Sequence, residues 1–298
     1  MDVTAWLLDG DPAIRWQTRL DLLDDEEGAA ADRALVESEG WGARLLDLQH
    51  EDGTWGHGVW TQRDWVGVDD ALLLLALLGA RGPRTAAAVD RVVAHVDWGA
   101  QWWHHPFFDG EVEPCINGRV LVAGSAFGHP SELIVERLIA EQQDDGGWNC
   151  YAQTRADPGS FHSTICALEG LTAYRYAGGP TEVAAAIDRG HGYLLERGLL
   201  RRKRDGALID PSWSAAAFPP YWRYDVLRGL DHLRAAGVRP DARLDEALDA
   251  VAAARGTDGR WRLDRVHPGE TLVTMEREGE PSRWNTLRAL RVLRWAGR

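Results

Sequence analysis

The stretch Gln-Gln-Asp-Asp-Gly-Gly-Trp at residues 142–148 decides the fold of this chain, because its pattern Gln-x-x-Asp-Gly-x-Trp recurs. Further copies span residues 49–55 and, with Arg in place of Gln, residues 255–261. Asp-Gly pairs, which favour turns and helix boundaries, recur at Asp52, Asp109, Asp145, Asp205 and Asp258, with spacings of 57, 36, 60 and 53 residues. Each interval can hold a helix, a turn and a second helix, so the pattern predicts a repetitive helical architecture.

Two kinds of helix are expected to alternate between these turns. Amphipathic segments, typical of an outer layer, are residues 29–49, 86–96, 133–142, 183–196 and 243–253. Segments that are apolar nearly all round, and therefore buried, are residues 14–23, 69–78, 115–127, 162–176, 224–235 and 283–295. The only candidates for short β pieces are residues 208–209 and 271–275.

The alternation predicts an all-α fold, an (α/α)5-6 toroid with an inner ring of helices inside an outer ring. The two ends of the chain resemble each other, with Arg-Trp-Gln-Thr at residues 15–18 and Arg-Trp-Asn-Thr at residues 283–286. This similarity indicates that the ring closes. Since no Pro/Ser-rich linker interrupts the pattern, we expect residues 1–298 to form a single domain. Trp55, Trp148 and Trp261 follow the same turn and are expected to pack over equivalent helix ends.

Composition narrows the possible partners and the compartment. The 33 basic and 46 acidic residues give a net charge of −13, which disfavours nucleic acid and anionic membrane surfaces. The longest apolar run, residues 71–80, is about half of the ~20 residues that a membrane span needs. The N-terminus carries Asp2 and Asp9 where a signal peptide has Lys or Arg. We therefore expect a cytoplasmic protein whose three cysteines are free or metal-bound thiols.

Cysteine and histidine residues cluster near the starts of two consecutive inner helices. Cys115, Cys150 and His162 are candidate zinc ligands, and Glu113 is a possible fourth ligand or a partner of a ligand. Helix N-termini are expected to lower the pKa of a thiol and favour the thiolate that a metal needs. Cys166 lies inside an apolar helix and is expected to be a packed thiol. The alternative is that all of these residues only pack in the core.

The repeated turns and the inner helix starts resemble the terpenoid cyclase/protein prenyltransferase α/α-toroid superfamily. Residues 144–150, 160–162 and 282–288 are similar to small bacterial proteins described as squalene-cyclase-like. This resemblance implies a central cavity for an isoprenoid or another apolar small molecule. The Asp-x-Asp-Asp acid box of class II cyclases is not matched by Val68-Asp69-Asp70, and 298 residues leave no room for a second barrel. Squalene or hopene cyclisation is therefore not expected.

A second resemblance, to the protein prenyltransferase β-subunit, implies zinc. Glu113-Pro114-Cys115 stands where that family has Asp-x-Cys, and residues 161–166 align with its Tyr-His-Thr-Cys-like segment. His104 and His105 stand where that family holds diphosphate with an Arg/Lys pair. Glu replaces Asp and His replaces Arg/Lys, so the similarity is closer for the metal site than for the diphosphate site.

Other polar and aromatic residues gather near the same helix starts. Glu113 or Asp225 is a candidate general base, and the aromatic residues that could line a cavity are Trp102, Trp103, Phe107, Phe108, Tyr221, Trp222 and Tyr224. Asp69, Arg228 and Arg283 could bind substrate, or could form salt bridges between helices. Three hypotheses follow. They are a zinc-dependent toroid enzyme, a non-catalytic toroid binding module, and a metal-free isoprenoid cyclase with Asp69 or Asp70 as the acid.

Overall fold

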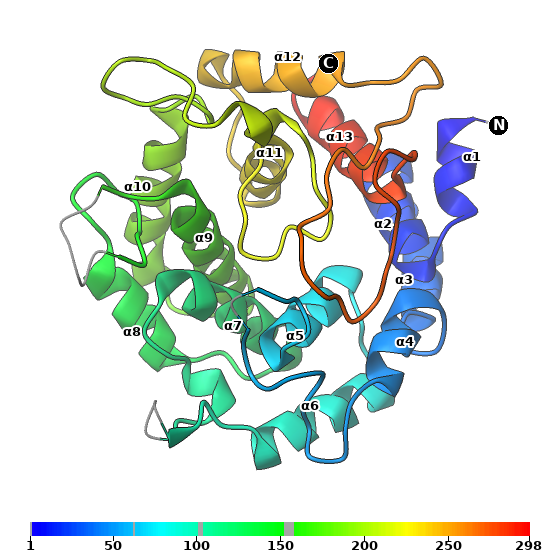
Figure 1. The fold of residues 1–298 in the computed structure, drawn as a ribbon. Coiled ribbons are helices and arrows are strands. Elements are labelled where there is room, and N and C mark those ends of the chain that lie inside the picture. The colour runs from blue at the N-terminus through cyan, green and yellow to red at the C-terminus, as the bar shows by residue number, and fades with distance from the viewer. Residues whose placement is uncertain (1, 62, 101–103, 152–157) are drawn as a thin grey trace.

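Two concentric rings of helices make up the fold, as the computed structural model of residues 2–61, 63–100, 104–151 and 158–298 shows (Figure 1). The inner helices are α2 (Pro12–Leu23), α5 (Val68–Leu78), α7 (Pro114–Phe127), α9 (Phe161–Tyr176), α11 (Val226–Ala235) and α13 (Arg283–Trp295). The outer helices are α1 (Val3–Leu8), α3 (Glu26–Ala34), α4 (Gly40–Asp47), α6 (Pro83–His95), α8 (Glu132–Glu141), α10 (Ala184–Leu195) and α12 (Asp245–Ala253). Short 3₁₀ helices are η2 (Phe107–Asp109), η3 (Thr181–Val183), η4 (Pro211–Ser214) and η5 (Ala242–Leu244). This arrangement is an α/α toroid, which confirms the expected fold class.

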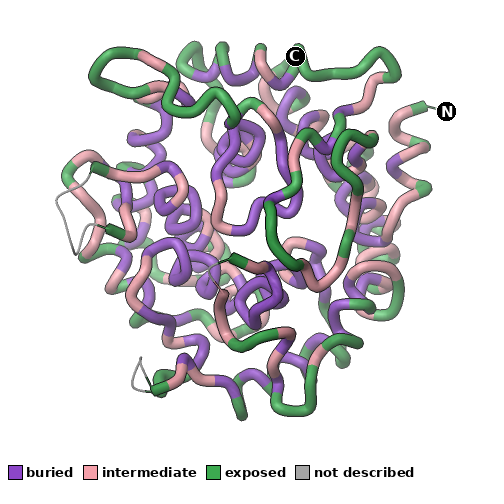
Figure 2. The backbone as a smooth tube through the Cα atoms, in the orientation of Figure 1, coloured by how far each residue is buried: buried purple, intermediate pink, exposed green. Residues whose placement is uncertain are grey.

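Burial separates the two rings as the apolar patterns predict. The inner helices are buried along most of their length, whereas the outer helices alternate between buried and exposed positions (Figure 2). Helix α5 shows this most clearly, since nine of its eleven residues are buried. The core of the molecule therefore lies within and just outside the inner ring.

The predicted outer helix at residues 29–49 was wrong in its continuity. The structure has two helices there, α3 and α4, joined by a turn over residues 35–39. Gly40 has φ +64°, a left-handed conformation that ends one helical path and starts another. The candidate β residues form only isolated bridges, Arg201 with Leu208 and Trp65 with Thr271, and the described residues contain no strand.

The repeated turn has the same hydrogen bonds at each copy. The indole N–H groups of Trp55, Trp148 and Trp261 each donate, at 2.7 Å, to the carbonyl ten residues earlier, near the end of the preceding outer helix. In two of the turns the Gln side chain donates to the next outer helix, Gln49 to the Ala88 carbonyl and Gln142 to the Ala186 carbonyl. The tryptophans therefore bind equivalent helix ends, as predicted, and the glutamines join consecutive outer helices.

Ring closure joins the two ends of the chain. On the inner ring, Arg291 of α13 donates to Gln17 and Asp21 of α2, both at 2.9 Å. At the start of α13, Arg283 donates to the carbonyl of Trp6 in α1 at 3.1 Å and lies over the indole ring of that residue. Helices α13 and α2 lie side by side in Figure 1, so the similarity of the two chain ends corresponds to neighbouring helices.

The segment before α11 crosses the interior of the ring. We call residues 215–225 the central loop, and Figure 1 shows this part of the chain reaching toward the centre. Phe218 stacks on Trp284 with ring centroids 4.2 Å apart, and Tyr221 stacks on Trp65 at 4.3 Å. Two of the cavities that adjoin this loop, one lined by Phe218 and Pro220 and the other by Trp222, share no lining residue. The sequence predicts a central cavity with aromatic walls, and the structure has two separate cavities beside the central loop.

Among the described residues, no helix combines the length and the apolar character that crossing a membrane requires.

Candidate metal centre

Close packing of two inner helices brings the candidate ligands together. Helices α7 and α9 meet through glycine, since a Cβ at Gly118 would lie 2.1 Å from the carbonyl oxygen of Cys166. Cys115 lies in the first turn of α7, directly after Glu113 and Pro114. The strand-like pair Trp148 and Ser160 holds the segment with Cys150 against the start of α9, where the backbone N–H of Cys150 donates to the Ser163 hydroxyl at 3.3 Å. The two thiols therefore meet at the same end of the ring.

Three ligand atoms converge at this point. The sulfurs of Cys115 and Cys150 are 3.0 Å apart, and the Cys115 sulfur lies 3.7 Å from Oε2 of Glu113. One ligand atom from each of these residues lies within 4.8 Å of the others, a grouping that could hold a metal ion. Two thiols and one carboxylate are a donor set that suits zinc and other borderline-soft transition metals.

His162 lies in the first turn of α9 but outside this group of converging atoms. Its Nδ1 accepts the backbone N–H of Tyr224 at 2.8 Å. Burial, together with Arg223 and Arg228, lowers the pKa of His162 from 6.5 to about 4, so the ring is neutral. Because Nδ1 accepts a hydrogen bond, the proton of the neutral ring is on Nε2. Among the described residues, the atoms that converge with the two thiols therefore belong to Glu113, whereas the sequence suggested His162 as the third ligand and Glu113 as a possible fourth.

The acidity of Cys115 differs from the expectation based on its helix N-terminus. The hydrogen bond with Cys150, followed by burial, raises the pKa of Cys115 well above its ordinary value. These two effects outweigh the helix dipole because the thiol is buried and its closest neighbour is another sulfur. Without a metal Cys115 is therefore held as a thiol, and a metal ion that binds there displaces its proton.

Cys166 is a packed thiol. It is fully buried, and its S–H donates to the carbonyl of Trp222 at 3.5 Å. It lies outside the group of Glu113, Cys115 and Cys150. The third cysteine therefore has the structural environment that its apolar helix predicts.

A cavity of about 500 Å³ adjoins the thiol pair. We call it the thiol cavity, and its lining consists of Trp60, Glu113, Cys115, Asn149, Cys150, Tyr151, Ser160, His162, Ser163 and Trp222. Its volume lies within the range of about 300–1,000 Å³ that is usual for small-molecule sites. Trp60, Tyr151 and Trp222 give it aromatic walls.

Several residues predicted to bind substrate lie outside the thiol cavity. His104 and His105 are exposed, and His104 pairs with Asp97 at 3.0 Å. Tyr224 is buried and its hydroxyl donates to the carbonyl of Leu199 at 2.7 Å. Arg283 contacts Trp6 near the ring closure. Only Trp222 of the predicted substrate-binding residues lines this cavity.

The charged candidates on the inner helices have other partners. Asp225 caps α11, accepting the N–H groups of Arg228 at 2.7 Å and Ala217 at 3.2 Å, so it is placed as a helix cap away from the thiols. Arg228 pairs with Glu169 and lines the second cavity. Asp69 is buried 3.1 Å from Arg119, in neither cavity. Trp102 and Trp103 lie outside the described residues.

Sequence reasoning assigned no role to five residues that line the thiol cavity, namely Trp60, Asn149, Tyr151, Ser160 and Ser163. Ser163 contacts the sulfur of Cys150 at 3.2 Å, and its position next to His162 at the helix start could have indicated it. Trp60 belongs to the loop before α5, and no spacing in the sequence links it to the cysteines. Its place in the lining depends on how the loop before α5 folds.

No family model matches the sequence, and no curated protein matches it. Among solved structures, it is similar to a point variant of the type II terpene cyclase MstE from Scytonema, without ligand. The two sequences are 16% identical, and the alignment covers 98% of this chain and 85% of that chain with a TM-score of 0.46. At this level the likeness is one of overall helical arrangement and carries no information about the reaction.

Proposed function

We propose that the protein is a toroid enzyme, built as one domain over residues 1–298, that binds one zinc ion through Glu113, Cys115 and Cys150. Its substrate is an isoprenoid or another apolar small molecule in the thiol cavity. The observation that carries this proposal is the convergence of the three ligand atoms within 4.8 Å at the wall of a cavity. Unpaired thiols of this kind favour a reducing compartment, the cytoplasm.

The donor set fits a catalytic rather than a structural zinc site. Catalytic zinc is held by three protein ligands and keeps a fourth position for water or substrate, whereas structural zinc has four protein ligands. The sulfurs are 3.0 Å apart, and two sulfurs on one tetrahedral zinc are about 3.8 Å apart. Side-chain rotations that move the sulfurs apart by less than ~1 Å therefore bring them to the separation that zinc requires.

The residues around the thiols have separate roles in this proposal. Bound zinc would supply Lewis acidity and would activate a substrate thiol or a water molecule. Glu113 holds the metal or, if displaced, accepts a proton. His162 presents its Nε2–H to the cavity as a hydrogen-bond donor, and Trp60 and Trp222 contact the apolar part of the substrate. Asp225 is left out of the catalytic set because it caps α11.

The two alternatives have less support. A metal-free cyclase needs a protonated acid facing its substrate. Burial raises the pKa of Asp69 to about 8, which keeps a proton, but this carboxyl lines neither cavity. Diphosphate recognition by His104 and His105 also lacks support, because these two histidines line neither cavity. A non-catalytic module would leave the thiol pair beside a cavity with no function for either.

Metal analysis tests the proposal. Protein purified without chelator should contain about one zinc per chain. Cys115→Ala and Cys150→Ala should each remove most of this metal, because two remaining ligands hold zinc far more weakly than three. Cys166→Ala is the matched control and should keep the metal. Wild-type protein that contains no zinc, and takes none up after reduction, would leave the non-catalytic module as the better account.

A further inference from the structure

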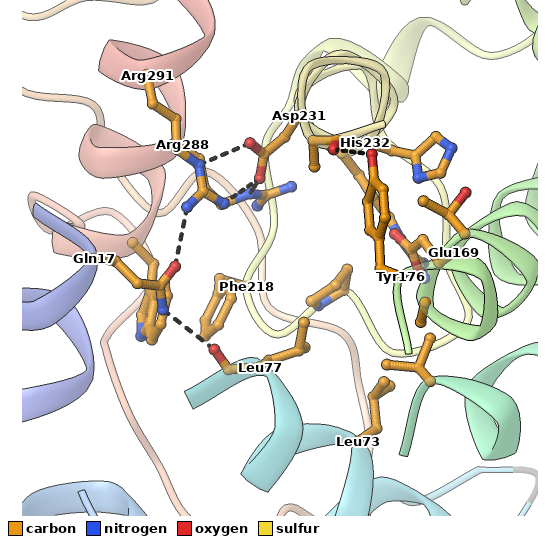
Figure 3. Close-up of a pocket in the computed structure, with 17 residues that line it drawn as sticks. Gln17, Leu73, Leu77, Glu169, Tyr176, Phe218, Asp231, His232, Arg288 and Arg291 are labelled. Atoms are coloured by element: carbon orange, nitrogen blue, oxygen red, sulfur yellow. Dashed lines mark hydrogen bonds and ion pairs between the residues drawn. The ribbon is translucent and has the colours of Figure 1, made fainter. Parts of the chain in front are cut away.

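A second cavity, of about 280 Å³, takes part of its lining from the central loop and none from the cysteines (Figure 3). We call it the arginine cavity. Its lining comes from all six inner helices and from the central loop, which contributes Phe218 and Pro220. Its volume is near the lower end of the range of about 300–1,000 Å³ for small-molecule sites. Nothing in the proposed zinc chemistry uses it.

The three arginines in the wall of this cavity, Arg228, Arg288 and Arg291, differ in how closely they are paired. The wall also holds the carboxylates Glu169 and Asp231, and behind it Asp21 pairs with Arg291 at 2.9 Å and Asp225 lies 3.9 Å from Arg288. Arg228 donates from Nε and Nη2 to both oxygens of Glu169, at 2.9 and 2.6 Å. Arg291 donates from Nε and Nη2 to both oxygens of Asp231. Each carboxylate is thus held by one arginine in a two-pronged pair, and Arg288 has no such partner.

Arg288 is a buried guanidinium with unused donors. Only 4% of the residue is exposed, and its Nη1 donates to the carbonyl of Ala217 at 3.1 Å. Its nearest carboxylate oxygens are 3.7 Å away on Asp231 and 3.9 Å away on Asp225, which is longer than a hydrogen bond. Within the described part of the chain, Nε and Nη2 of Arg288 therefore donate no hydrogen bond. A buried cation in this state is stabilised by an acceptor that binds both groups.

The rest of the wall is mainly apolar. Leu73 and Leu77 of α5 lie across the cavity from the charged groups in Figure 3, and Phe218 and Trp284 add a stacked aromatic pair. His232 is neutral, because burial lowers its pKa to about 4, and it contacts His191 at 3.0 Å. The cavity therefore has a buried guanidinium with two free hydrogen-bond donors at one side and apolar surface at the other.

We propose that the arginine cavity binds a small monocarboxylate with an apolar body, whose carboxylate pairs with Nε and Nη2 of Arg288. Arginine recognises carboxylates in this planar, two-pronged geometry. The ligand enters past the exposed residues Tyr176 and Ala235, whose hydroxyl and carbonyl groups are joined by a 3.0 Å hydrogen bond at the rim. This site is independent of the metal centre and of the proposed function.

Calorimetric titration of the purified chain tests this site with two ligands of nearly equal size. Hydrocinnamate carries the carboxylate, and hydrocinnamyl alcohol replaces it with a neutral hydroxyl. We expect the carboxylate to bind at least about tenfold more tightly, which corresponds to ~1.4 kcal/mol. Arg288→Gln should remove this preference. Arg294→Gln, an exposed arginine on the same helix, should leave it unchanged.

A second variant keeps the test decisive if Arg288→Gln does not fold. Ala235→Trp places a large side chain at the exposed rim and should abolish binding of hydrocinnamate without changing the zinc content. Equal affinity for acid and alcohol would overturn the assignment, and so would binding that persists in Ala235→Trp. Failure of wild-type protein to bind hydrocinnamate would overturn it as well, whatever the metal analysis shows.

Discussion

At the scale of single residues, the tryptophan of the repeated turn joins a helix end to a loop with one hydrogen bond and a buried ring. Trp148 is fully buried and donates its indole N–H to the carbonyl of Leu138. Its own backbone N–H donates to the Thr164 hydroxyl of α9 at 2.9 Å. The residue therefore ties the outer helix α8 to the inner helix α9.

We expect Trp148→Ala to lower the free energy of unfolding by about 3–5 kcal/mol, because it leaves a large cavity and an unpaired carbonyl. Urea titration followed by circular dichroism measures this change. Leu133→Ala on α8, where the side chain is 59% exposed, is the control and should cost less than ~0.5 kcal/mol. Equal stability of Trp148→Ala and wild type would contradict the structural role.

Asp69 and Asp70 share one buried cation, Arg119. Asp69 lies 3.1 Å from Arg119, and Asp70 accepts a hydrogen bond from it. Two buried carboxylates and one guanidinium leave an excess negative charge. Burial, opposed by Arg119 and reinforced by Asp70, raises the pKa of Asp69 from 3.8 to about 8. Near neutral pH the folded protein therefore holds a proton at this pair.

This proton makes stability depend on pH in a definite direction. Between 3.8 and about 8 the folded state keeps the proton of Asp69 and the unfolded state releases it, so its contribution to the free energy of unfolding falls as pH rises. The slope is at most ~1.4 kcal/mol per pH unit for one proton. Asp69→Asn mimics the protonated form, so its stability relative to wild type should increase from about pH 5 to about pH 8. Parallel unfolding profiles for the two proteins would disprove this.

At the scale of elements, the contact between α7 and α9 positions the candidate metal centre. Gly118 and Gly170 allow the two backbones to touch, since a Cβ at Gly170 would lie 2.5 Å from the carbonyl oxygen of Gly118. The neighbouring first turns carry Cys115 on α7 and Ser163 on α9, and Ser163 holds Cys150. The separation of the helices therefore sets the separation of the thiols.

Gly118→Ala tests this contact. A methyl group 2.1 Å from the Cys166 carbonyl oxygen must push the helices apart, and we expect a loss of about 3 kcal/mol in unfolding free energy. Gly192→Ala in α10 is the matched control, because its Cβ would meet nothing within 4 Å. There the gain in helix propensity should stabilise the protein by up to ~1 kcal/mol. Chemical denaturation of both variants measures the difference, and similar stabilities would argue against close helix contact.

At the scale of the whole molecule, an ion-pair network closes the ring. Arg291 of α13 binds Asp231 of α11 and, with Gln17, Asp21 of α2. The side chains of Arg291 and Asp231 are largely buried. The network therefore joins the last two inner helices, α11 and α13, to the first, α2. The two chain ends consequently stabilise each other across the inner ring.

Removing this arginine should weaken the ring as a unit. Arg291→Gln leaves the carboxylates of Asp21 and Asp231 without their closest cation. We expect the free energy of unfolding to fall by about 3–5 kcal/mol, because these carboxylates stay buried. Arg294→Gln breaks an exposed pair with Asp24 on the same helix and should cost less than ~1 kcal/mol. Thermal unfolding by calorimetry compares the two variants. Similar melting temperatures would show that closure does not depend on Arg291.

Local patterns were sufficient to predict the two rings, because a helix that is apolar on all sides can only be buried. The repeated turn was also predictable, because each copy carries its own Asp-Gly and Trp residues. The proximity of Cys115 and Cys150 followed from their positions near the starts of consecutive inner helices, and the 3.0 Å between their sulfurs agrees with it. In all of these cases the decisive interactions lie within or between neighbouring elements.

Tertiary structure alone decided which side chain lies beside the two thiols and how the interior is shaped. Glu113 joins the thiols while His162 faces the Tyr224 N–H, a hydrogen bond between residues 62 positions apart. The central loop divides the interior because Phe218 and Tyr221 stack on Trp284 and Trp65 from distant segments. Periodicity records which side of a helix is buried, but it holds no information about which distant side chain fills a given space. Those choices depend on long-range packing, which only the folded chain establishes.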